Sequence, residues 1–284
     1  MTTRHELRPV SGGFIDVDAV MRVLANHAIE GSEICEPAAA RHTRLLPITS
    51  GQVQVTIELR STAVILTTDA VDDSLAEVVS AVRRWCDLDT DLEPIVAHLA
   101  SDPLLAASCR ERPAVRVTRF PDGFEGAVTT VLGQQVSLAA LRTLAGRVVR
   151  RYGSAHPGGL LQFPDPATLA AVDPERFATK VGMPRTRAHA AIAVAQGFST
   201  DPRLHTPTDA ESFRTALLEI RGVGPWTADY MCVRLLGDPD AFTPGDLIAR
   251  RAMGVSTSAQ ARDRAQSWHP YRAYALAHLW LAAG

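Results

Sequence analysis

Lysine is almost absent from this chain of 284 residues. Lys180 is the only one, so 28 of the 29 basic side chains are arginines. Chemistry that passes through a Schiff base needs a lysine or a terminal amine. The sequence therefore offers one internal residue for such chemistry, and that residue lies far along the chain from the motifs described below.

Cysteine pairs and long apolar runs are also missing. The cysteines form no C-x-x-C pair and have no histidine at the spacing of metal ligands; they are Cys35, Cys86, Cys109 and Cys232. This argues against a zinc site or an iron–sulfur cluster.

No apolar run approaches the roughly 18 residues of a membrane span. The first residues also lack the apolar segment of a secretory signal. We therefore expect a cytoplasmic protein with no membrane partner.

The formal net charge of −2 hides an uneven distribution. Residues 1–110 hold 9 basic and 16 acidic side chains, a net charge of −7. Residues 111–284 hold 20 basic and 15 acidic side chains, a net charge of +5. A basic half can mark a nucleic-acid surface, although basic faces are often only solvated.

Hydrophobic spacing divides the chain into a small mixed part and a larger helical part. In residues 1–90, apolar residues at helical spacing predict a helix over 14–29, and a second helix should run from Asp72 to Cys86. The runs 45–59 and 62–68 are rich in Val, Ile and Thr and are expected to pair as an antiparallel sheet. We assign this acidic unit a structural role only.

From about residue 92 the pattern is almost entirely helical. Turn signals separate expected helices at 124–152, 166–172, 174–180, 184–197, 209–219, 226–236, 246–253, 258–266 and 270–282. The fold class is therefore α+β: a mostly helical bundle preceded by a small antiparallel-sheet domain. Within 91–284 we expect a central helical domain over about 113–230 and a second lobe built from 91–112 and 231–284.

A glycine turn between two of these helices is the first candidate functional element. Gly222 and Gly224 flank Val223, and glycine permits both positive φ and close approach of another backbone. The free N–H groups at the start of the next helix would suit a phosphate. The same glycines would equally serve an ordinary connector. Leucines before the turn (Leu217, Leu218) and apolar residues after it (Met231, Val233) are expected to pack the two helices together.

Asp246 and nearby aromatic residues form the second candidate. A carboxylate can stabilise positive charge on a sugar and can orient or deprotonate water. The Pro-Gly-Asp sequence before 247–249 is also good helix-capping chemistry. Trp226 and Tyr230, four residues apart, should share a helix face. Trp268 and Tyr274 could line a binding pocket with these aromatic residues or belong to the hydrophobic core.

Together these elements resemble the helix-hairpin-helix and Gly/Pro-Asp signature of a DNA glycosylase superfamily. The residues concerned are Ile220, Gly222, Val223, Gly224, Trp226, Thr227, Ala228, Pro244, Gly245 and Asp246. The stretches 124–137, 181–184 and 268–280 resemble the alkylbase branch, the bacterial 3-methyladenine DNA glycosylase II family. The likeness covers nearly the whole chain.

The resemblance implies a monomeric enzyme that flips alkylated, cationic purines out of double-stranded DNA and hydrolyses the N-glycosidic bond. Asp246 would be the catalytic residue, and Trp226, Tyr230 and Trp280 would wall a pocket that attracts a cationic base. DNA would be bound by Arg221, Gly222, Val223, Gly224, Thr227, Gln134 and Gln135. We expect no metal in the site and no cofactor, although a monovalent cation could bind at the hairpin with DNA. A nucleoid-associated place in the cytoplasm would follow.

Three departures from the family pattern carry information. Arg221 replaces a usual proline and could add positive charge at the DNA backbone. Gln135 replaces the leucine that fills the gap left by a flipped base, or it could simply bridge helices with Gln134. Trp226 occupies the position where bifunctional members carry a nucleophilic lysine, so strand cleavage is not expected.

Two other interpretations stay open at this point. A non-catalytic helix-hairpin-helix module would bind DNA but would need neither Asp246 nor the aromatic set. A glycosylase of the mismatch or oxidised-base branches would commonly use a metal cluster or a lysine nucleophile, and neither occurs at the expected place.

The first prediction concerns strand cleavage. We expect borohydride to trap no covalent complex between this protein and abasic-site DNA, because no lysine stands at position 226. The measurement is a denaturing gel, with a bifunctional glycosylase as the positive control. A trapped complex would contradict the monofunctional assignment.

Overall fold

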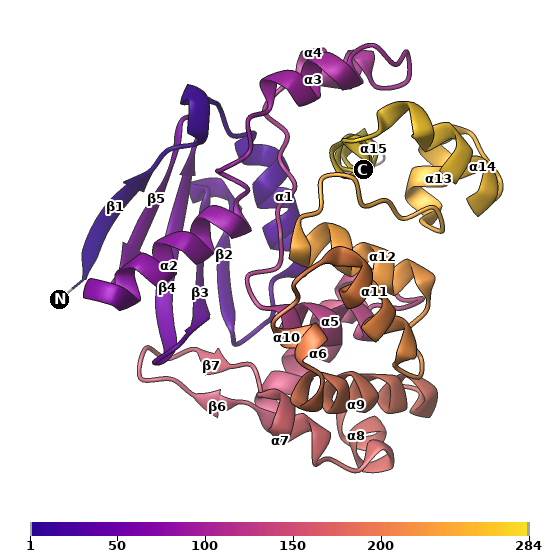
Figure 1. Ribbon diagram of the computed structural model, residues 1–284. Helices are drawn as coiled ribbons and strands as arrows, with labels where there is room; N and C mark the ends of the chain where they lie inside the picture. Colours follow the sequence, from indigo (N-terminus) through magenta and orange to yellow (C-terminus); the bar gives the residue numbers. More distant parts are fainter. Residues whose placement is uncertain (1, 283–284) are drawn as a thin grey trace.

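Alternating apolar side chains build a five-stranded sheet in the first part of the chain. The computed structural model describes residues 2–282. The strands lie in the order β1-β5-β4-β3-β2, and every neighbouring pair is antiparallel (Figure 1). Their bounds are β1 Thr3–Leu7, β2 Glu33–Glu36, β3 Arg41–Ile48, β4 Gly51–Arg60 and β5 Ala63–Thr68.

The expected antiparallel pairing is confirmed for β4 and β5, in which Arg60 lies opposite Ala63. The run 45–59 is not one strand, however, since the chain turns back after Ile48 and resumes opposite it at Gly51. Gly51 has a φ of 136°, which permits this two-residue turn. The edge strands β1 and β2 were not predicted, because their charged, half-exposed sequences lack an apolar run.

Two helices complete the first domain. α1 (Val17–His27) begins at Asp16, whose side chain accepts a hydrogen bond from the Ala19 N–H at 3.0 Å. α2 (Asp72–Trp85) lies across one face of the sheet (Figure 1). Both predicted helices are confirmed, with α1 shorter at each end than expected. α1 lies between the sheet and the helical part of the molecule, which places it beside the cavity described below (Figure 1).

The remainder is helical apart from one short hairpin, β6 (Ser154–Ala155) with β7 (Leu161–Gln162). The helices are α3 Glu93–Leu99, α4 Ala106–Glu111, α5 Gly123–Leu132, α6 Leu138–Tyr152, α7 Pro166–Ala170, α8 Pro174–Val181, α9 Arg185–Thr200, α10 Pro202–His205, α11 Ala210–Glu219, α12 Pro225–Met231, α13 Leu247–Met253, α14 Ser258–Arg264 and α15 Arg272–Ala282. A π-helical turn, η3 (Cys232–Leu236), follows α12, and short 3-10 turns lie at Val10–Gly12, Pro37–Ala39 and Ala265–Trp268. The helical interpretation is confirmed for most segments.

One predicted helix, 124–152, is wrong as a single element. The chain breaks between α5 and α6, where Gln135 has a φ of 56°. Ser137 then starts α6 by accepting a hydrogen bond from the Ala140 N–H at 3.2 Å. The left-handed residue and the new N-cap cannot belong to a continuous helix, so the break presents an exposed tip on the surface.

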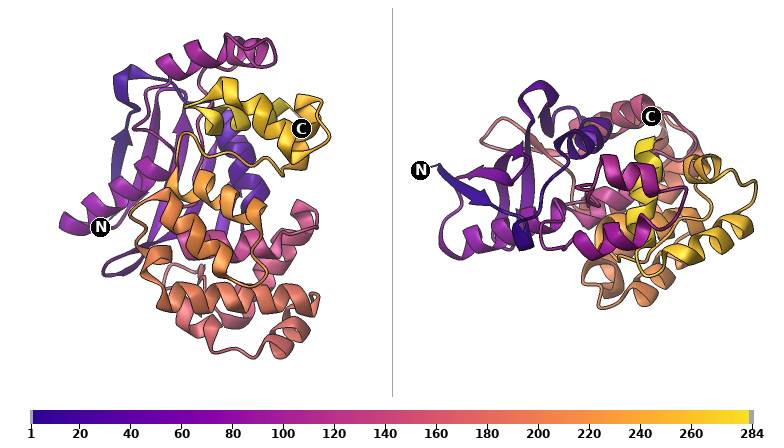
Figure 2. Two further views of the ribbon diagram at one scale, coloured as in Figure 1. Left: turned by 45° about the vertical axis from the view of Figure 1, so that its right-hand side comes forward. Right: turned by 90° about the horizontal axis from the view of Figure 1, so that it is seen from above.

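The helical part contains two separate hydrophobic cores. One is enclosed by α5 to α12, with Phe177, Phe213 and Met231 buried in it. The other brings α3 and α4 against α13 to α15, so that segments far apart in the sequence lie side by side (Figure 2). Trp268 and Tyr274 belong to this second core, with exposed fractions of 0% and 3%, and they are not cavity walls.

A buried ion pair joins the sheet to the central helices. Arg44 on β3 donates to both carboxylate oxygens of Glu125 on α5, at 2.8 and 2.9 Å. It also donates to Glu33 on β2 at 3.0 Å. Since all three side chains are buried, removal of one partner would leave an uncompensated charge. The sheet domain and α5 are therefore held in a fixed relation.

The cysteines are all free, and Cys86, Cys109 and Cys232 are buried. Burial raises the pKa of the Cys86 and Cys232 thiols to about 12, so these side chains act as packing groups. Within residues 2–282, no helix combines the length and the apolar character that a membrane crossing requires.

The second prediction concerns pH and His278 on α15. Its ring nitrogens lie 2.7 Å from Ser108 Oγ and 3.8 Å from Cys109 Sγ, and burial lowers the pKa of His278 to about 4. In the unfolded chain His278 takes up a proton as the pH falls through 6.5, whereas in the folded chain it stays neutral down to about pH 4. The folded state is therefore destabilised as the pH drops from 6.5 towards 4. Between pH 7 and 5, protonation of His278 lowers the free energy of unfolding by about 2 kcal/mol.

Chemical denaturation of wild type and of His278→Gln at pH 7 and 5 measures this contribution. Gln can keep the hydrogen bond to Ser108, so the variant should show a smaller pH-dependent loss. The same change at the exposed His205 is the matched control. Equal pH dependence in wild type and His278→Gln would show that His278 is not the group responsible.

Candidate active site

α12 carries two of the expected aromatic residues on one face. Trp226 and Tyr230 stand one helical turn apart, and their rings stack with centroids 5.1 Å apart and an interplanar angle of 12°. Trp280 on α15 meets Tyr230 edge-on at 5.7 Å and 62°. The structure therefore brings all three residues together, although two helices from different cores supply them.

Asp246 lies at the start of α13 beside these rings. Its Oδ1 accepts from the Ala249 N–H at 2.8 Å, which caps the helix. The indole N–H of Trp226 donates to Oδ2 at 3.1 Å, and that of Trp280 donates to Oδ1 at 3.3 Å. The residue is 6% exposed and lines a cavity. Asp246 is thus a helix cap and a cavity carboxylate at once.

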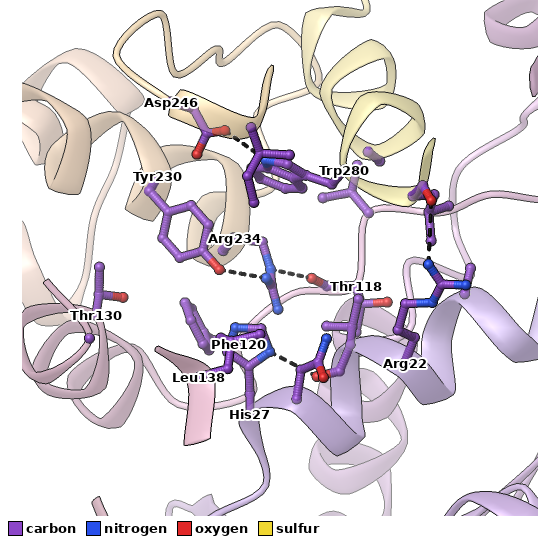
Figure 3. Close-up of a pocket in the computed structure, with 18 of the residues that line it drawn as sticks. Arg22, His27, Thr118, Phe120, Thr130, Leu138, Tyr230, Arg234, Asp246 and Trp280 are labelled. Carbon is purple, nitrogen blue, oxygen red and sulfur yellow. Dashed lines mark hydrogen bonds between the residues drawn. The ribbon is translucent and has the colours of Figure 1, made fainter. Parts of the chain in front are cut away.

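The cavity has a volume of about 280 Å³ and lies between α1 of the first domain and the two helical cores. Figure 3 shows Asp246, Tyr230 and Trp280 on one side of it and His27, Phe120 and Leu138 on the other. The first domain also contributes Arg22, Val23 and Asn26 through α1. The purely structural role expected for that domain is therefore incomplete, because α1 forms a wall of the cavity.

Arg234 enters the same cavity from the π-helical turn. Its Nε donates to the Thr118 carbonyl at 2.6 Å, and its Nη1 donates to the Tyr230 hydroxyl at 2.7 Å. The guanidinium carbon lies 4.8 Å from the centre of the Phe120 ring. Sequence reasoning missed this residue, although it stands four positions after Tyr230, at the same spacing that joins Tyr230 to Trp226.

His27 and Phe120 were also missed, and no local pattern marks them. His27 Nδ1 lies 2.8 Å from the Val23 carbonyl, and a carbonyl can only accept. Burial and the nearby charge of Arg234 lower the pKa of His27 to about 4. The ring is therefore neutral at pH 7, with Nε2 as an acceptor. Phe120 reaches the cavity because Gly126 leaves room for it; a Cβ there would lie 2.6 Å from the ring.

The glycine turn links α11 to α12 as expected. Gly222 has a φ of 91°, and a Cβ on it would lie 2.4 Å from the Ala190 side chain, so only glycine fits. Gly224 has an ordinary φ of −98° and open space where a Cβ would stand. Val223, Leu217 and Met231 are buried between the helices. The expectation was wrong for Leu218, which is 37% exposed, and for Val233, which packs in the other core.

The polar residues assigned to DNA binding fall into two groups. Gln134 Nε2 donates to the Gly222 carbonyl at 3.2 Å and to Thr227 Oγ1 at 3.1 Å, so it braces the turn from within. Thr227 is buried, with an exposed fraction of 3%. Arg221 and Gln135 are exposed, and Gln135 lies at the tip between α5 and α6.

Comparison with known proteins fits this geometry. Residues 14–122 match the family model described as the AlkA N-terminal domain. Residues 128–267 match that of the HhH-GPD superfamily base excision DNA repair proteins. The chain is 34% identical over 267 residues to DNA-3-methyladenine glycosylase 2 of Escherichia coli, a match that covers 93% of this chain and 85% of that protein. The chain belongs to the HhH-GPD superfamily.

Two further likenesses extend the comparison. The chain is 36% identical over 272 residues to a probable bifunctional transcriptional activator/DNA repair enzyme AlkA of Mycobacterium tuberculosis, covering 93% of this chain and 54% of that protein. The chain thus spans about half the length of that relative. The solved 3-methyladenine DNA-glycosylase of Archaeoglobus fulgidus has the same fold, with a TM-score of 0.82, 19% identity and coverage of 99% and 98% of the two chains.

In this HhH-GPD protein the single lysine stands outside the cavity. Lys180 is exposed on α8 and is not among the cavity residues. In the described part of the chain, no three His, Cys, Asp or Glu side chains are grouped to hold a metal ion. The cavity is lined by one carboxylate, a neutral imidazole, a set of aromatic rings and the guanidinium groups of Arg22, Arg116 and Arg234.

The third prediction separates the two glycines of the turn. Gly222→Ala should lower the free energy of unfolding by about 2–4 kcal/mol, because it adds both a left-handed alanine and a clash with Ala190. Gly224→Ala should unfold like the wild type, since its backbone is ordinary and its Cβ would meet nothing. Urea denaturation of both variants gives the comparison, and equal losses would refute the assignment.

Proposed function

We propose that this chain is a monofunctional DNA glycosylase that removes alkylated purines such as 3-methyladenine from double-stranded DNA and leaves an abasic site. The observation that carries the proposal is the buried Asp246 carboxylate beside Trp226, Tyr230 and Trp280 in a base-sized cavity. A non-catalytic DNA-binding role would leave both the carboxylate and the cavity without use.

The mechanism follows from the charges involved. An alkylated purine carries a positive charge, and aromatic faces attract it by about 0.5–2 kcal/mol depending on desolvation. When the bond from C1′ to the base breaks, the base leaves uncharged and the sugar becomes positive. Asp246 stabilises that sugar charge and takes the proton of the water that attacks C1′. The two indole N–H groups hold the carboxylate in place for this task.

The hairpin and the tip between α5 and α6 bind the DNA. The open space at Gly224 lets a phosphate approach the backbone N–H groups of the turn, with Val223 beside it. Gln134 and Thr227 brace that turn, and Arg221 adds an exposed positive charge. Gln135, held outward by its backbone, fills the gap left by the flipped base and can hydrogen-bond the unpaired partner.

Further assignments go with this function. The protein acts as a monomer in the cytoplasm, associated with the nucleoid. It uses no cofactor, although a monovalent cation at the carbonyl groups of the hairpin would help to bind the phosphate.

The fourth prediction tests the catalytic assignment. Duplex DNA treated with dimethyl sulfate is incubated with the wild type and with Asp246→Asn, and the released methylpurines are measured by chromatography. Asn keeps an acceptor for the helix cap but removes the charge, so release should fall at least about a hundredfold. Binding to duplex DNA with a stable abasic-site analogue should be retained.

Asp263→Asn, at an exposed position on α14 in the same lobe, is the matched control and should release bases normally. Equal DNA binding by wild type and Asp246→Asn, with no base released by either, would overturn the glycosylase assignment in favour of a binding module.

A further inference from the structure

Arg187, near the start of α9, is hydrogen-bonded to the tip between α5 and α6. Its Nη2 donates to the Gln134 carbonyl oxygen at 2.7 Å. Arg187 is half-buried, whereas Gln135, the next residue of the tip, is exposed. A hydrogen bond from a charged donor is about twice as strong as one between neutral groups, so the tip is held firmly against α9.

The place of this hydrogen bond in the chain matters for Gln135. The Gln134 carbonyl belongs to the peptide group that joins Gln134 to Gln135, so Arg187 fixes the plane from which Gln135 departs. Gln135 has a φ of 56°, a conformation that residues other than glycine adopt only at a cost. Such a conformation persists where the surrounding structure holds it. Arg187 supplies part of that support.

The same helix also supports the hairpin. Ala190 stands one turn after Arg187 on α9, and its Cβ occupies the space in which a side chain on Gly222 would lie, 2.4 Å away. Gln134 Nε2 joins the tip to the hairpin by donating to the Gly222 carbonyl at 3.2 Å. α9 packs against α5 as well (Figure 1). The tip, the hairpin and α9 therefore form a closed set of contacts.

We propose that Arg187 is a positioning residue for base flipping. Through the Gln134 carbonyl it holds Gln135 at a fixed place relative to the hairpin, where Gln135 fills the gap left by the flipped base. The inference rests on the glycosylase function proposed above. Arg187 does not line the cavity, so bond cleavage should not depend on it directly.

The pairing of the lesion decides how much this support matters. A base that leaves the helix loses its stacking and its partner, and the cost is smallest when the base is already unpaired. A tip that is no longer held in place should therefore slow the excision of a paired base much more than that of an unpaired base. Loss of packing alone would slow both excisions alike.

The fifth prediction compares one lesion in two DNA contexts. 7-Methylguanine is placed opposite cytosine or in a single-nucleotide bulge, where it has no partner. Single-turnover release is measured at saturating enzyme, so that DNA affinity does not affect the rate. In Arg187→Met the rate on the paired lesion should fall about tenfold, as when a hydrogen bond from a charged donor is lost. The rate on the bulged lesion should stay close to that of the wild type.

Two further sets of variants sharpen the test. Arg187→Lys keeps a charged donor of similar length and should restore most of the paired rate. Arg185→Met is the matched control, because Arg185 carries the same charge on α9, has a side chain that is 80% exposed, and pairs with Glu175 at 2.7 Å. Its two rates should keep the wild-type ratio. Gln135→Ala, alone and with Arg187→Met, completes a double-mutant cycle, in which the second change should add little to the first.

The rate on the bulged lesion also reports whether each variant is folded. If Arg187→Met does not fold by its thermal melt, Arg187→Gln, which is polar but too short to reach the carbonyl, carries the same expectation; loss of folding in both would assign Arg187 to stability and overturn the inference. An unchanged paired rate, equal falls on both lesions or additive effects in the cycle would overturn it while sparing the glycosylase function. Wild type that releases no base in either context would overturn both.

Discussion

The position of the cavity depends on one carboxylate. Asp246 accepts from the Ala249 backbone and from two indoles, and the three donors belong to α13, α12 and α15. A buried carboxylate is costly unless it is hydrogen-bonded, so these contacts offset its burial as well as fix its position. Because α12 lies in one helical core and α15 in the other, the hydrogen bonds of Asp246 also fix how the two lobes meet.

This arrangement explains why much of the site could be read from the sequence. The glycine turn, the aromatic pair one helical turn apart and the capping aspartate lie within about thirty residues of one another, and their spacing follows from helix geometry. Trp280 came only from family resemblance, since nothing local distinguishes it from Trp268, which is buried core. The helices were predictable for the same reason, because apolar periodicity is a local property.

Features that depend on tertiary contacts could not be read in this way. Phe120 reaches the cavity through the absence of a side chain at Gly126, and His27 reaches it from the last turn of α1, far away in the sequence. The break at Gln135 was missed because the residues on both sides favour a helix. Edge strands β1 and β2 form because they pair with β5 and β3, and their own residues carry no pattern that predicts a strand.

The π-helical turn after α12 limits where the chain can gain or lose residues. A π-turn contains one more residue than an α-turn, and such turns often mark functional sites. η3 (Cys232–Leu236) carries Arg234, which donates to the Thr118 carbonyl and the Tyr230 hydroxyl. Loss of one residue before Arg234 would give a more regular helix but rotate that side chain by about 100° about the helix axis. The length of η3 is therefore constrained more tightly than its residue types. In related sequences we expect insertions and deletions in the outer loops instead.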